Sequence, residues 1–175
     1  MQKFISLALL VFVGIIAGCR GGLIASAAPR AVSALQPTAG SQVSGEVTFS
    51  AVGSKLRVVA EVSGLTPGAH GFHIHERGDC GSPDGSSAGG HFNPAGKPHG
   101  NPELADHHGG DMPQLIADAE GHARLTAYVD GVRIGEGADG IIGRSVIVHA
   151  SPDDFRTQPT GNSGARLACG VISLK

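Results

Sequence analysis

Three segments of the chain alternate between apolar and polar residues with a period of two. In residues 43–51 the odd positions are apolar or small and the even positions are polar, and residues 56–62 and 123–129 repeat the period. Gly53, Gly64 and Gly121 mark turns at the ends of these segments. Successive side chains of a strand point to opposite faces of a sheet, so this pattern predicts strands with one buried face.

The remaining segments also favour strands, and none carries a convincing helical stripe. Shorter strand candidates are residues 71–76, 114–118, 144–150 and 167–174. Glycine makes up 28 of the 175 residues and charged residues only 16%, which argues against a charge-rich helical bundle. A chain of this length favours one domain. We therefore predict an all-β domain, either a sandwich or a barrel.

The N-terminus has the pattern of an export signal. Lys3 precedes an apolar run over residues 4–17, which is too short for the ~20 residues of a membrane helix but fits a signal peptide. The run ends at Cys19, and residues 16–19 resemble a bacterial lipoprotein cleavage box. We expect an exported lipoprotein in the periplasm or on the cell surface, with residues 1–18 as the signal peptide and Cys19 as the lipidated residue.

Two alternatives to lipidation stay open. Residues 25–27, Ala-Ser-Ala, could form an ordinary cleavage site that releases a soluble protein, and the apolar run could remain as an uncleaved anchor. Residues 21–36 lack sustained periodicity. We therefore predict a flexible tether over residues 19–39, followed by a folded domain over residues 40–175.

Cys80 and Cys169 are the only cysteines of the mature domain. Export places them in an oxidising compartment, which favours a disulfide between them over two buried free thiols. Cys80 lies in a loop region and Cys169 in the last apolar segment. The bond would tie that loop to the scaffold.

Two long segments without a strand pattern carry the chemistry-bearing residues. Residues 77–113 and 151–165 are rich in glycine, proline and aspartate, and loops of this length in a compact domain are usually functional or disordered. The chain has nine histidines, which points to metal binding. Its net charge of −2 gives no general attraction to nucleic acid.

The histidine positions strengthen the expectation of a metal. Alternation in residues 71–76 places His73 and His75 on one face of a strand and the apolar residues between them on the other. Alone, this pair could equally be two surface histidines. Three imidazoles with a carboxylate suit zinc, whereas a site of imidazoles alone suits copper. The further candidates are His91, His99, His108, Asp111 and His149.

The domain resembles the copper/zinc superoxide dismutases of the exported bacterial type. The resemblance runs from about residue 40 to residue 175 and rests on four motifs. These are Gly-Phe-His-Ile-His-Glu at 71–76, Gly-Gly-His-Phe-Asn-Pro at 89–94, His-x-Gly-Asp at 108–111 and the closing Gly-Asn-Ser-Gly-Ala-Arg-Leu-Ala-Cys-Gly-Val-Ile at 161–172. It implies an eight-stranded Greek-key barrel, of the broad sandwich architecture that immunoglobulin domains share.

The resemblance also implies a role for each candidate residue. The family dismutates superoxide by redox cycling of copper, with a structural zinc beside it. The implied copper ligands are His73, His75, His91 and His149, and the implied zinc ligands are His91, His99, His108 and Asp111. His91 would bridge the metals, Asp153 would link a copper ligand to a zinc ligand, Arg166 would guide the anion, and Cys80–Cys169 would be the family's disulfide.

Several residues have plainer interpretations. His70 matches a structural histidine of the family and is expected to be buried, whereas His107 and His122 are expected to be solvated. Asp154 is the alternative to Asp153 as the linking carboxylate. Arg166 could also be only a surface residue at the start of a strand.

Three functions compete at this stage. A metal-storage or copper-delivery protein of the same fold would be favoured by a missing copper ligand or guide arginine. The four copper-ligand positions and the arginine position are all filled. A zinc hydrolase normally needs an open coordination position, which a four-residue zinc set does not leave. The resemblance implies superoxide as the substrate, and the membrane is expected as a partner only through the lipid anchor. A homodimer is compatible with the family, whose branches differ in how, and whether, they dimerise.

Overall fold

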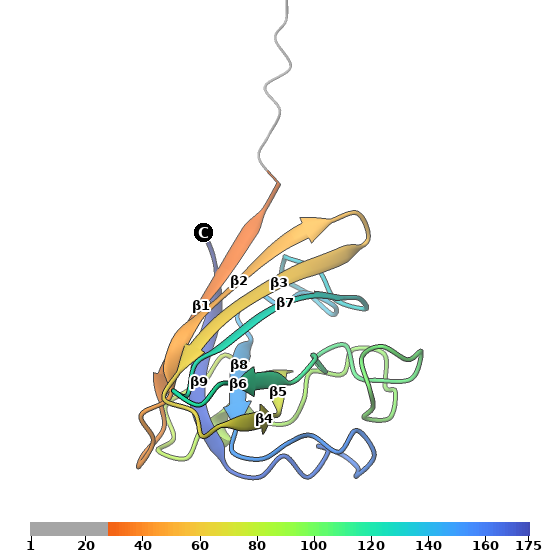
Figure 1. Ribbon diagram of the computed structural model, residues 1–175. Coiled ribbons are helices and arrows are strands. Elements are labelled where there is room, and N and C mark those ends of the chain that lie inside the picture. Colours follow the sequence, from red (N-terminus) through yellow and green to blue (C-terminus); the bar gives the residue numbers. More distant parts are fainter. Residues whose placement is uncertain (1–27) are drawn as a thin grey trace, which may run out of the picture.

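The computed structural model describes residues 28–175, which form nine strands and one short 3₁₀ helix (Figure 1). The signal peptide, Cys19 and the Ala-Ser-Ala site lie outside the described residues. Within residues 28–175, no helix has the length and hydropathy needed to cross a membrane. The elements are β1 (Arg30–Pro37), β2 (Ser44–Val52), β3 (Lys55–Ser63), β4 (Gly68–His70), β5 (Phe72–His75), η1 (Ser86–Ala88), β6 (Leu115–Ala117), β7 (Ala123–Val129), β8 (Ser145–His149) and β9 (Arg166–Leu174).

The strands form an antiparallel sheet that curls into a nearly closed barrel. Their order is β4-β6-β7-β3-β2-β1-β9-β8-β5, so the two end strands, β4 and β5, are separated in sequence by Gly71 alone. Gly71 donates its N–H to Ser151 and accepts the N–H of His149, both at 2.9 Å. The segment from β4 to β5 therefore joins the two edges of the sheet. Counted as one bent strand, it gives the eight strands of the expected fold, and the all-β prediction is confirmed.

The alternating segments place their apolar residues in one core. Val47, Phe49 and Val58 are fully buried, and the register pairs Phe49 with Val58 across β2 and β3. Burial of this kind contributes roughly 25 cal/mol per Å² of apolar surface. The core strands thus form a rigid support on which the long loops can be positioned.

The prediction of a tether over residues 19–39 is wrong for its second half. Residues 30–37 form β1, which pairs with β2 on one side and β9 on the other. Ala31, Ser33 and Leu35 face inward and are almost fully buried. The period of two is present here, but Ser33 interrupts its apolar face, and its hydroxyl has no hydrogen-bond partner among the described residues. The folded domain therefore begins near residue 30.

Removal of β1 should destabilise the barrel strongly. A protein that begins at Thr38 loses the buried side chain of Leu35 and leaves β2 and β9 without their shared neighbour. We expect its free energy of unfolding to fall by about 3 kcal/mol or more relative to a protein that begins at Ala28, in line with other losses of buried apolar side chains. Urea unfolding of the two proteins measures the difference. Equal midpoints would mean that β1 contributes little to the barrel.

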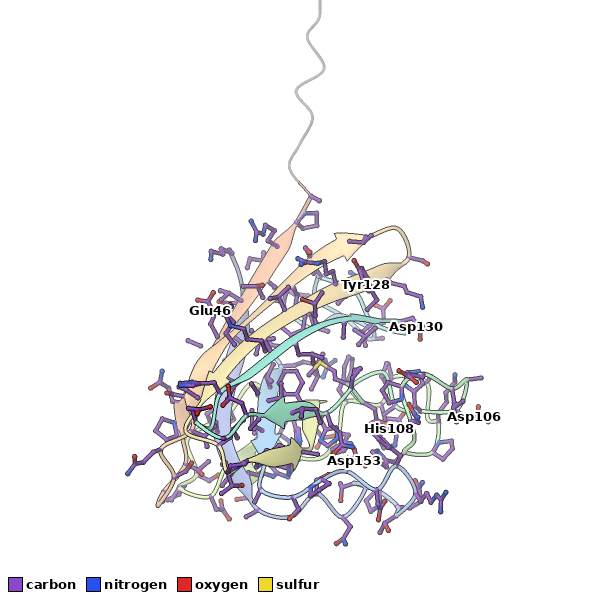
Figure 2. The ribbon with its side chains drawn as sticks, in the orientation of Figure 1. Glu46, Asp106, His108, Tyr128, Asp130 and Asp153 are labelled. Carbon is purple, nitrogen blue, oxygen red and sulfur yellow. A yellow bond between two sulfur atoms is a disulfide. The ribbon has the colours of Figure 1, made fainter. Side chains whose placement is uncertain are left out.

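Two long loops lie beside the short strands β4, β5 and β6. Figure 1 shows the first, residues 76–114, in green and the second, residues 150–165, in blue. Side chains of the two loops gather on this side of the barrel, where Figure 2 labels His108 and Asp153, whereas Glu46 and Tyr128 lie on the β2 and β7 surfaces of the sheet.

Candidate metal centre

The strand β5 presents two histidines to the loops. Phe72 and Ile74 point into the core, and His73 and His75 point to the opposite face, as the alternation predicts. All four side chains are nevertheless buried, because the first loop covers the outer face of β5. Isolated bridges pair His73 with Asp111 and His75 with His91. The strand thereby brings residues of three segments together.

Gly110 allows the first loop to pack closely against β5. Its N–H donates to Phe92, and its carbonyl accepts the N–H of Ile74, both at 2.8 Å. A Cβ at this position would lie 2.3 Å from the carbonyl oxygen of Ile74. Only glycine lets the backbone of residues 108–111 approach β5 so closely.

The first candidate group consists of four buried histidines whose ring nitrogens lie within 4.8 Å of one another: His73, His75, His91 and His149. His75 donates its Nδ1–H to Gly89 at 2.9 Å, and His149 donates its Nδ1–H to Gly164 at 3.2 Å. These bonds fix the tautomers and leave both Nε2 atoms as acceptors, 3.4 Å apart. Two facing lone pairs at this distance favour a cation between them.

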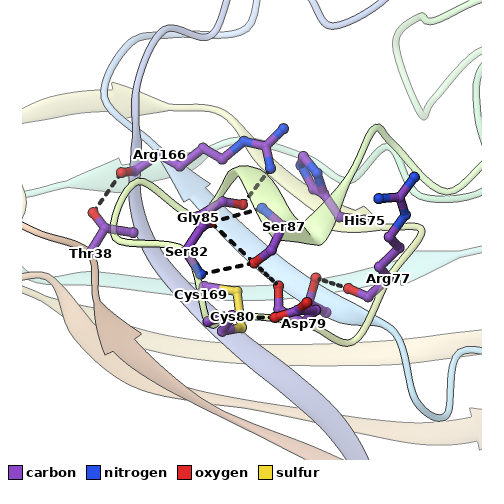
Figure 3. Close-up of a disulfide and its surroundings, with 12 residues drawn as sticks. Thr38, His75, Arg77, Asp79, Cys80, Ser82, Gly85, Ser87, Arg166 and Cys169 are labelled. Atoms are coloured by element: carbon purple, nitrogen blue, oxygen red, sulfur yellow. Dashed lines mark hydrogen bonds between the residues drawn. A yellow bond between two sulfur atoms is a disulfide. The ribbon is translucent and has the colours of Figure 1, made fainter.

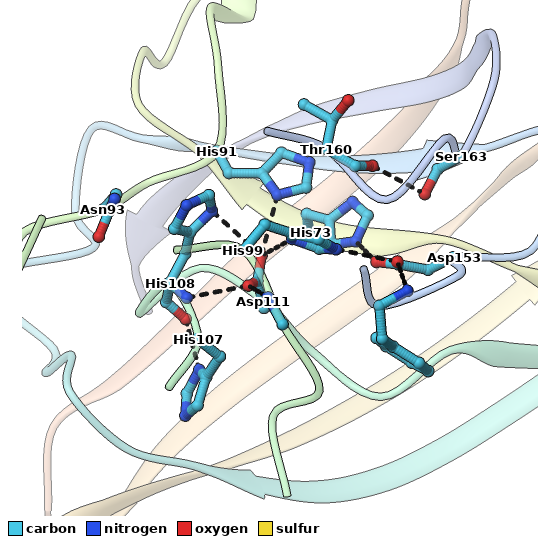
Figure 4. A network of polar contacts seen from close by, with 12 residues as sticks. His73, His91, Asn93, His99, His107, His108, Asp111, Asp153, Thr160 and Ser163 are labelled. Atoms are coloured by element: carbon cyan, nitrogen blue, oxygen red, sulfur yellow. Dashed lines mark hydrogen bonds and ion pairs between the residues drawn. The ribbon is translucent and has the colours of Figure 1, made fainter. Parts of the chain in front are cut away.

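Asp153 holds the third histidine of this group in place. It accepts the Nε2–H of His73 at 2.6 Å with one oxygen and the Nε2–H of His99 at 2.9 Å with the other (Figure 4). Nδ1 of His73 is therefore the free ring nitrogen, and Asp153 connects a histidine of the first group to one of the second. Asp154 is exposed, and among the described residues its carboxylate accepts bonds only from Arg156 and Thr157 of its own turn. The structure thus places Asp153, and not Asp154, at the linking position.

The second candidate group gathers around one carboxylate: His91, His99, His108 and Asp111. The Oδ2 atom of Asp111 accepts the backbone N–H groups of Gly100 and His108 at 3.1 and 2.9 Å. Its Oδ1 atom lies 2.9, 3.0 and 3.4 Å from Nδ1 of His91, His99 and His108. Backbone bonds therefore fix the carboxylate, and Oδ1 faces three imidazoles.

Unpartnered buried nitrogens test whether these groups suit a metal. Among the described residues, the buried side-chain atoms without a hydrogen-bond partner include Nδ1 of His73, Nε2 of His91, and Nδ1 of His99 and His108. The last two face Oδ1 of Asp111 at 3.0 and 3.4 Å but do not have hydrogen-bond geometry. A buried polar atom without a partner is costly, unless a ligand satisfies it. All four belong to the two groups. The donor sets thus fit one ion coordinated by imidazoles and another by three imidazoles and a carboxylate.

The electrostatics of the site favour neutral imidazoles in the first group. Burial lowers the pKa of His75 and His149 well below the usual range, and the neighbouring histidines lower it further. Burial lowers the pKa of His91 to about 4. These rings are therefore uncharged near neutral pH, each with one N–H and one free lone pair, and the neutral ring is the state that binds metal ions.

The carboxylates stabilise positive charge in the second group. Burial alone would lower the pKa of His99, but Asp111 and Asp153 together raise it to about 9. Burial would raise the pKa of Asp111, yet His108, His91 and His99 hold it far below the usual range. The position among these residues therefore favours a cation.

Arg166, the first residue of β9, reaches the edge of the all-histidine group (Figure 3). Its two terminal nitrogens donate to the carbonyl oxygens of Gly85 and Gly89 at 2.6 and 2.7 Å. The carbonyl of Gly89 also accepts the bond from His75. The side chain is half-buried and fixed in direction, so it is more than a surface residue at a strand start.

The Cys80–Cys169 disulfide is confirmed, with Cα atoms 5.7 Å apart. It ties residues 77–90 to β9, from which Arg166 also extends (Figure 3). The same loop supplies the carbonyl groups of Gly85 and Gly89 that orient Arg166. The bond therefore supports the position of the guanidinium.

The other three histidines lie outside both groups. His70 is fully buried, with ring nitrogens 2.8 Å from the carbonyl oxygens of Thr66 and His149, and His122 is exposed, both as expected.

The prediction that His107 is solvated is wrong. It is only 6% exposed and donates its Nδ1–H to the carbonyl of His108, because the loop folds this ring inward against the end of β7 near Asp130.

Two glutamines contact the site, and no motif in the sequence identifies either of them. Gln114 accepts the backbone N–H of Asp153 at 2.9 Å, and Gln158 bonds to the backbone of His99. Each acts across a long separation in sequence, and neither lies in a motif with metal-ligand spacing. Only the fold reveals them.

Known proteins share both the sequence and the fold. The family model for copper/zinc superoxide dismutase (SODC) matches residues 43–172. A superoxide dismutase [Cu-Zn] of Caulobacter vibrioides is 44% identical, over 73% of this chain and 77% of that protein. A crystal structure described as the clock protein EA4 has a TM-score of 0.75 and 36% identity, covering 85% of this chain and 96% of that one. Since the family model spans most of the barrel and both loops, the chain belongs to the copper/zinc superoxide dismutases, enzymes whose cofactors are copper and zinc.

Proposed function

We propose that His73, His75, His91 and His149 hold a catalytic copper ion, and that His91, His99, His108 and Asp111 hold a structural zinc ion beside it. The observation that carries this assignment is the membership of His91 in both groups. Its Nδ1 atom lies 2.9 Å from Asp111, and its Nε2 atom is buried without a partner. His91 would therefore bridge the two ions when both are bound.

The bridge needs a ring that has lost both of its protons. Two adjacent dications make that state favourable near neutral pH, and the low pKa of His91, about 4, leaves only one of the two protons to remove. When bound, copper supplies one-electron chemistry by alternating between Cu(II) and Cu(I), so that two superoxide anions and two protons give one dioxygen and one hydrogen peroxide. Zinc is redox-inert and supplies only positive charge.

The protein's own groups handle the proton and the anion. His91 holds a proton at Nε2 and delivers it during turnover, while its Nδ1 atom stays directed at the zinc residues. Arg166 donates its remaining N–H groups to the anion, in a direction that the carbonyls of Gly85 and Gly89 fix. Asp153 keeps the ring of His73 oriented.

Metal analysis of the purified mature protein, with a superoxide assay on the same sample, tests the proposal. We expect one copper and one zinc per chain, and activity that is lost with copper and restored when copper is added back. Copper binding without dismutation would favour a storage or delivery role. Activity that survives complete copper removal would contradict the assignment.

We also propose that the protein is exported and anchored through a lipid on Cys19. The apolar run followed by Cys19 supports this localisation. Since β1 begins at Arg30, ten residues separate the anchor from the barrel, enough to span at most about 36 Å. A homodimer stays a prediction.

Analysis of the N-terminus of the native protein tests whether Cys19 carries a lipid anchor. Acyl chains contribute about 0.8 kcal/mol per buried methylene group, so several chains on Cys19 would hold the protein at the membrane essentially permanently. Mass spectrometry should find Cys19 as the first residue, carrying lipid, and a Cys19→Ser variant should appear in the soluble fraction. An unmodified wild-type N-terminus near Ala28 would instead indicate ordinary secretion.

A further inference from the structure

Gln158 is bonded to both backbone groups of one residue in the zinc set. Its Oε1 atom accepts the N–H of His99 at 2.8 Å, and its Nε2 atom donates to the carbonyl of His99, also at 2.8 Å. The two residues are 59 positions apart in sequence, in different loops. Among the described residues, no other group bonds to the backbone of His99. The side-chain amide therefore replaces the partner that a neighbouring strand would provide.

The backbone of the second loop closes over the same histidine. Gly161 has a φ of +64°, and a Cβ added there would overlap Asp153 Oδ1 and lie 2.5 Å from Nε2 of His99. These two atoms form the hydrogen bond that orients the ring of His99. Gln158 therefore holds the backbone of His99, while Asp153 and Gly161 enclose its ring.

We propose that Gln158 is a positioning residue for the zinc site, which fixes the backbone of His99 so that its Nδ1 atom stays directed toward Asp111. His99 lies in a loop without regular secondary structure, so its ring can keep this direction only if its backbone is held. The bonds to Asp153 and Gln158 act at opposite ends of the residue, and because Nε2–H donates to Asp153, the free lone pair of the ring is on Nδ1. The second loop thus controls how firmly the first loop retains zinc.

The test compares two identical substitutions at different places. Gln158→Met keeps the length of the side chain and removes both hydrogen bonds to His99, together with a longer one, 3.3 Å, from Nε2 to the carbonyl of Arg156 in the same loop. Gln42→Met is the matched control at an exposed glutamine outside the two loops. We measure zinc release from the metal-loaded protein to a coloured chelator, and the visible absorption of protein that carries cobalt in place of zinc. Loss of such outer partners typically lowers metal affinity about 10- to 100-fold.

We expect Gln158→Met to release zinc about tenfold faster or more and to change the cobalt spectrum, while Gln42→Met matches the wild type in both. The metal-free Gln158→Met protein should unfold at the same urea concentration as the metal-free wild type. Equal release rates and spectra in the two variants would overturn the inference. So would a parallel loss of stability in the metal-free Gln158→Met protein, which would indicate a general structural role.

Because the inference rests on the proposed assignment of His99 to zinc, the wild type serves as its own control. Wild-type protein that binds neither zinc nor cobalt would refute the proposed function. Wild-type protein that binds both metals, with a Gln158→Met variant that behaves identically, would refute the role of Gln158 alone.

Discussion

Replacement of His149 by alanine should abolish dismutation and leave zinc in place. His149 supplies one of the four imidazoles of the first group, and its Nε2 atom lies 3.4 Å from that of His75. It contributes nothing to the second group. We expect activity to fall by at least about 1000-fold, which corresponds to about 4 kcal/mol in the barrier. Activity and the copper and zinc content of the same sample are the measurements.

The reciprocal substitution, Asp111→Ala, should release zinc and leave most of the copper bound by four imidazoles. Asp111 is the only carboxylate of the second group, and three imidazoles alone have no anion to balance the ion's charge. Since its Oδ2 atom also holds two backbone N–H groups, Asp111→Asn is the matched variant that keeps a neutral acceptor. Equal loss of both metals in the His149 and Asp111 variants would contradict the assignment of two distinct sites.

The sequence predicts the barrel well because its strands face a core on one side only. Residues 123–129 are both the predicted and the observed span of β7, and the predicted segment 43–51 is shifted by one residue from β2, which spans 44–52. The period is less visible in β1, because Ser33 interrupts the buried face and Val32 and Ala34 place apolar residues on the opposite face. Its pairing with β9 joins the first and last strands of the described domain, which no local pattern reveals.

The sequence predicts which residues belong to the candidate metal site better than it predicts how those residues are buried and held in place. The spacing of His73 and His75 places both on one face of a strand, and the family motifs supply the other candidates. Burial of that face depends on the loop backbone reaching β5 through Gly110, which is a property of the fold. The inward orientation of His107 and the bonds of Gln158 depend on the same long-range packing.

Arg166→Ala should slow dismutation and remove most of its dependence on salt. The net charge of the chain is −2, so attraction of an anion must come from local charge. In the second loop the charged residues are Asp153, Asp154 and Arg156, with neither lysine nor glutamate, and Asp153 is occupied by two histidines. Arg166 therefore supplies a fixed positive charge beside the proposed copper ligands.

We expect the rate constant to fall about 10- to 100-fold in Arg166→Ala, since hydrogen bonds to charged groups contribute about 1.5–3 kcal/mol. Arg166→Lys should recover only part of this loss, because lysine keeps the charge but cannot reproduce the planar pair of bonds to Gly85 and Gly89. The wild-type rate should fall as ionic strength rises to physiological values, where the Debye length is about 8 Å.

A third variant separates attraction by Arg166 from attraction by the rest of the surface. Asp84 lines the same cleft as Arg166, and hydrogen bonds from Ser86 lower the pKa of its carboxyl to about 2, so it carries a negative charge throughout the working pH range. Asp84→Asn should therefore raise the rate at low salt and steepen the dependence on ionic strength. A flat or rising wild-type dependence would mean that local attraction does not control capture. If Arg166→Ala keeps the full wild-type slope, the anion is steered by charges elsewhere on the surface.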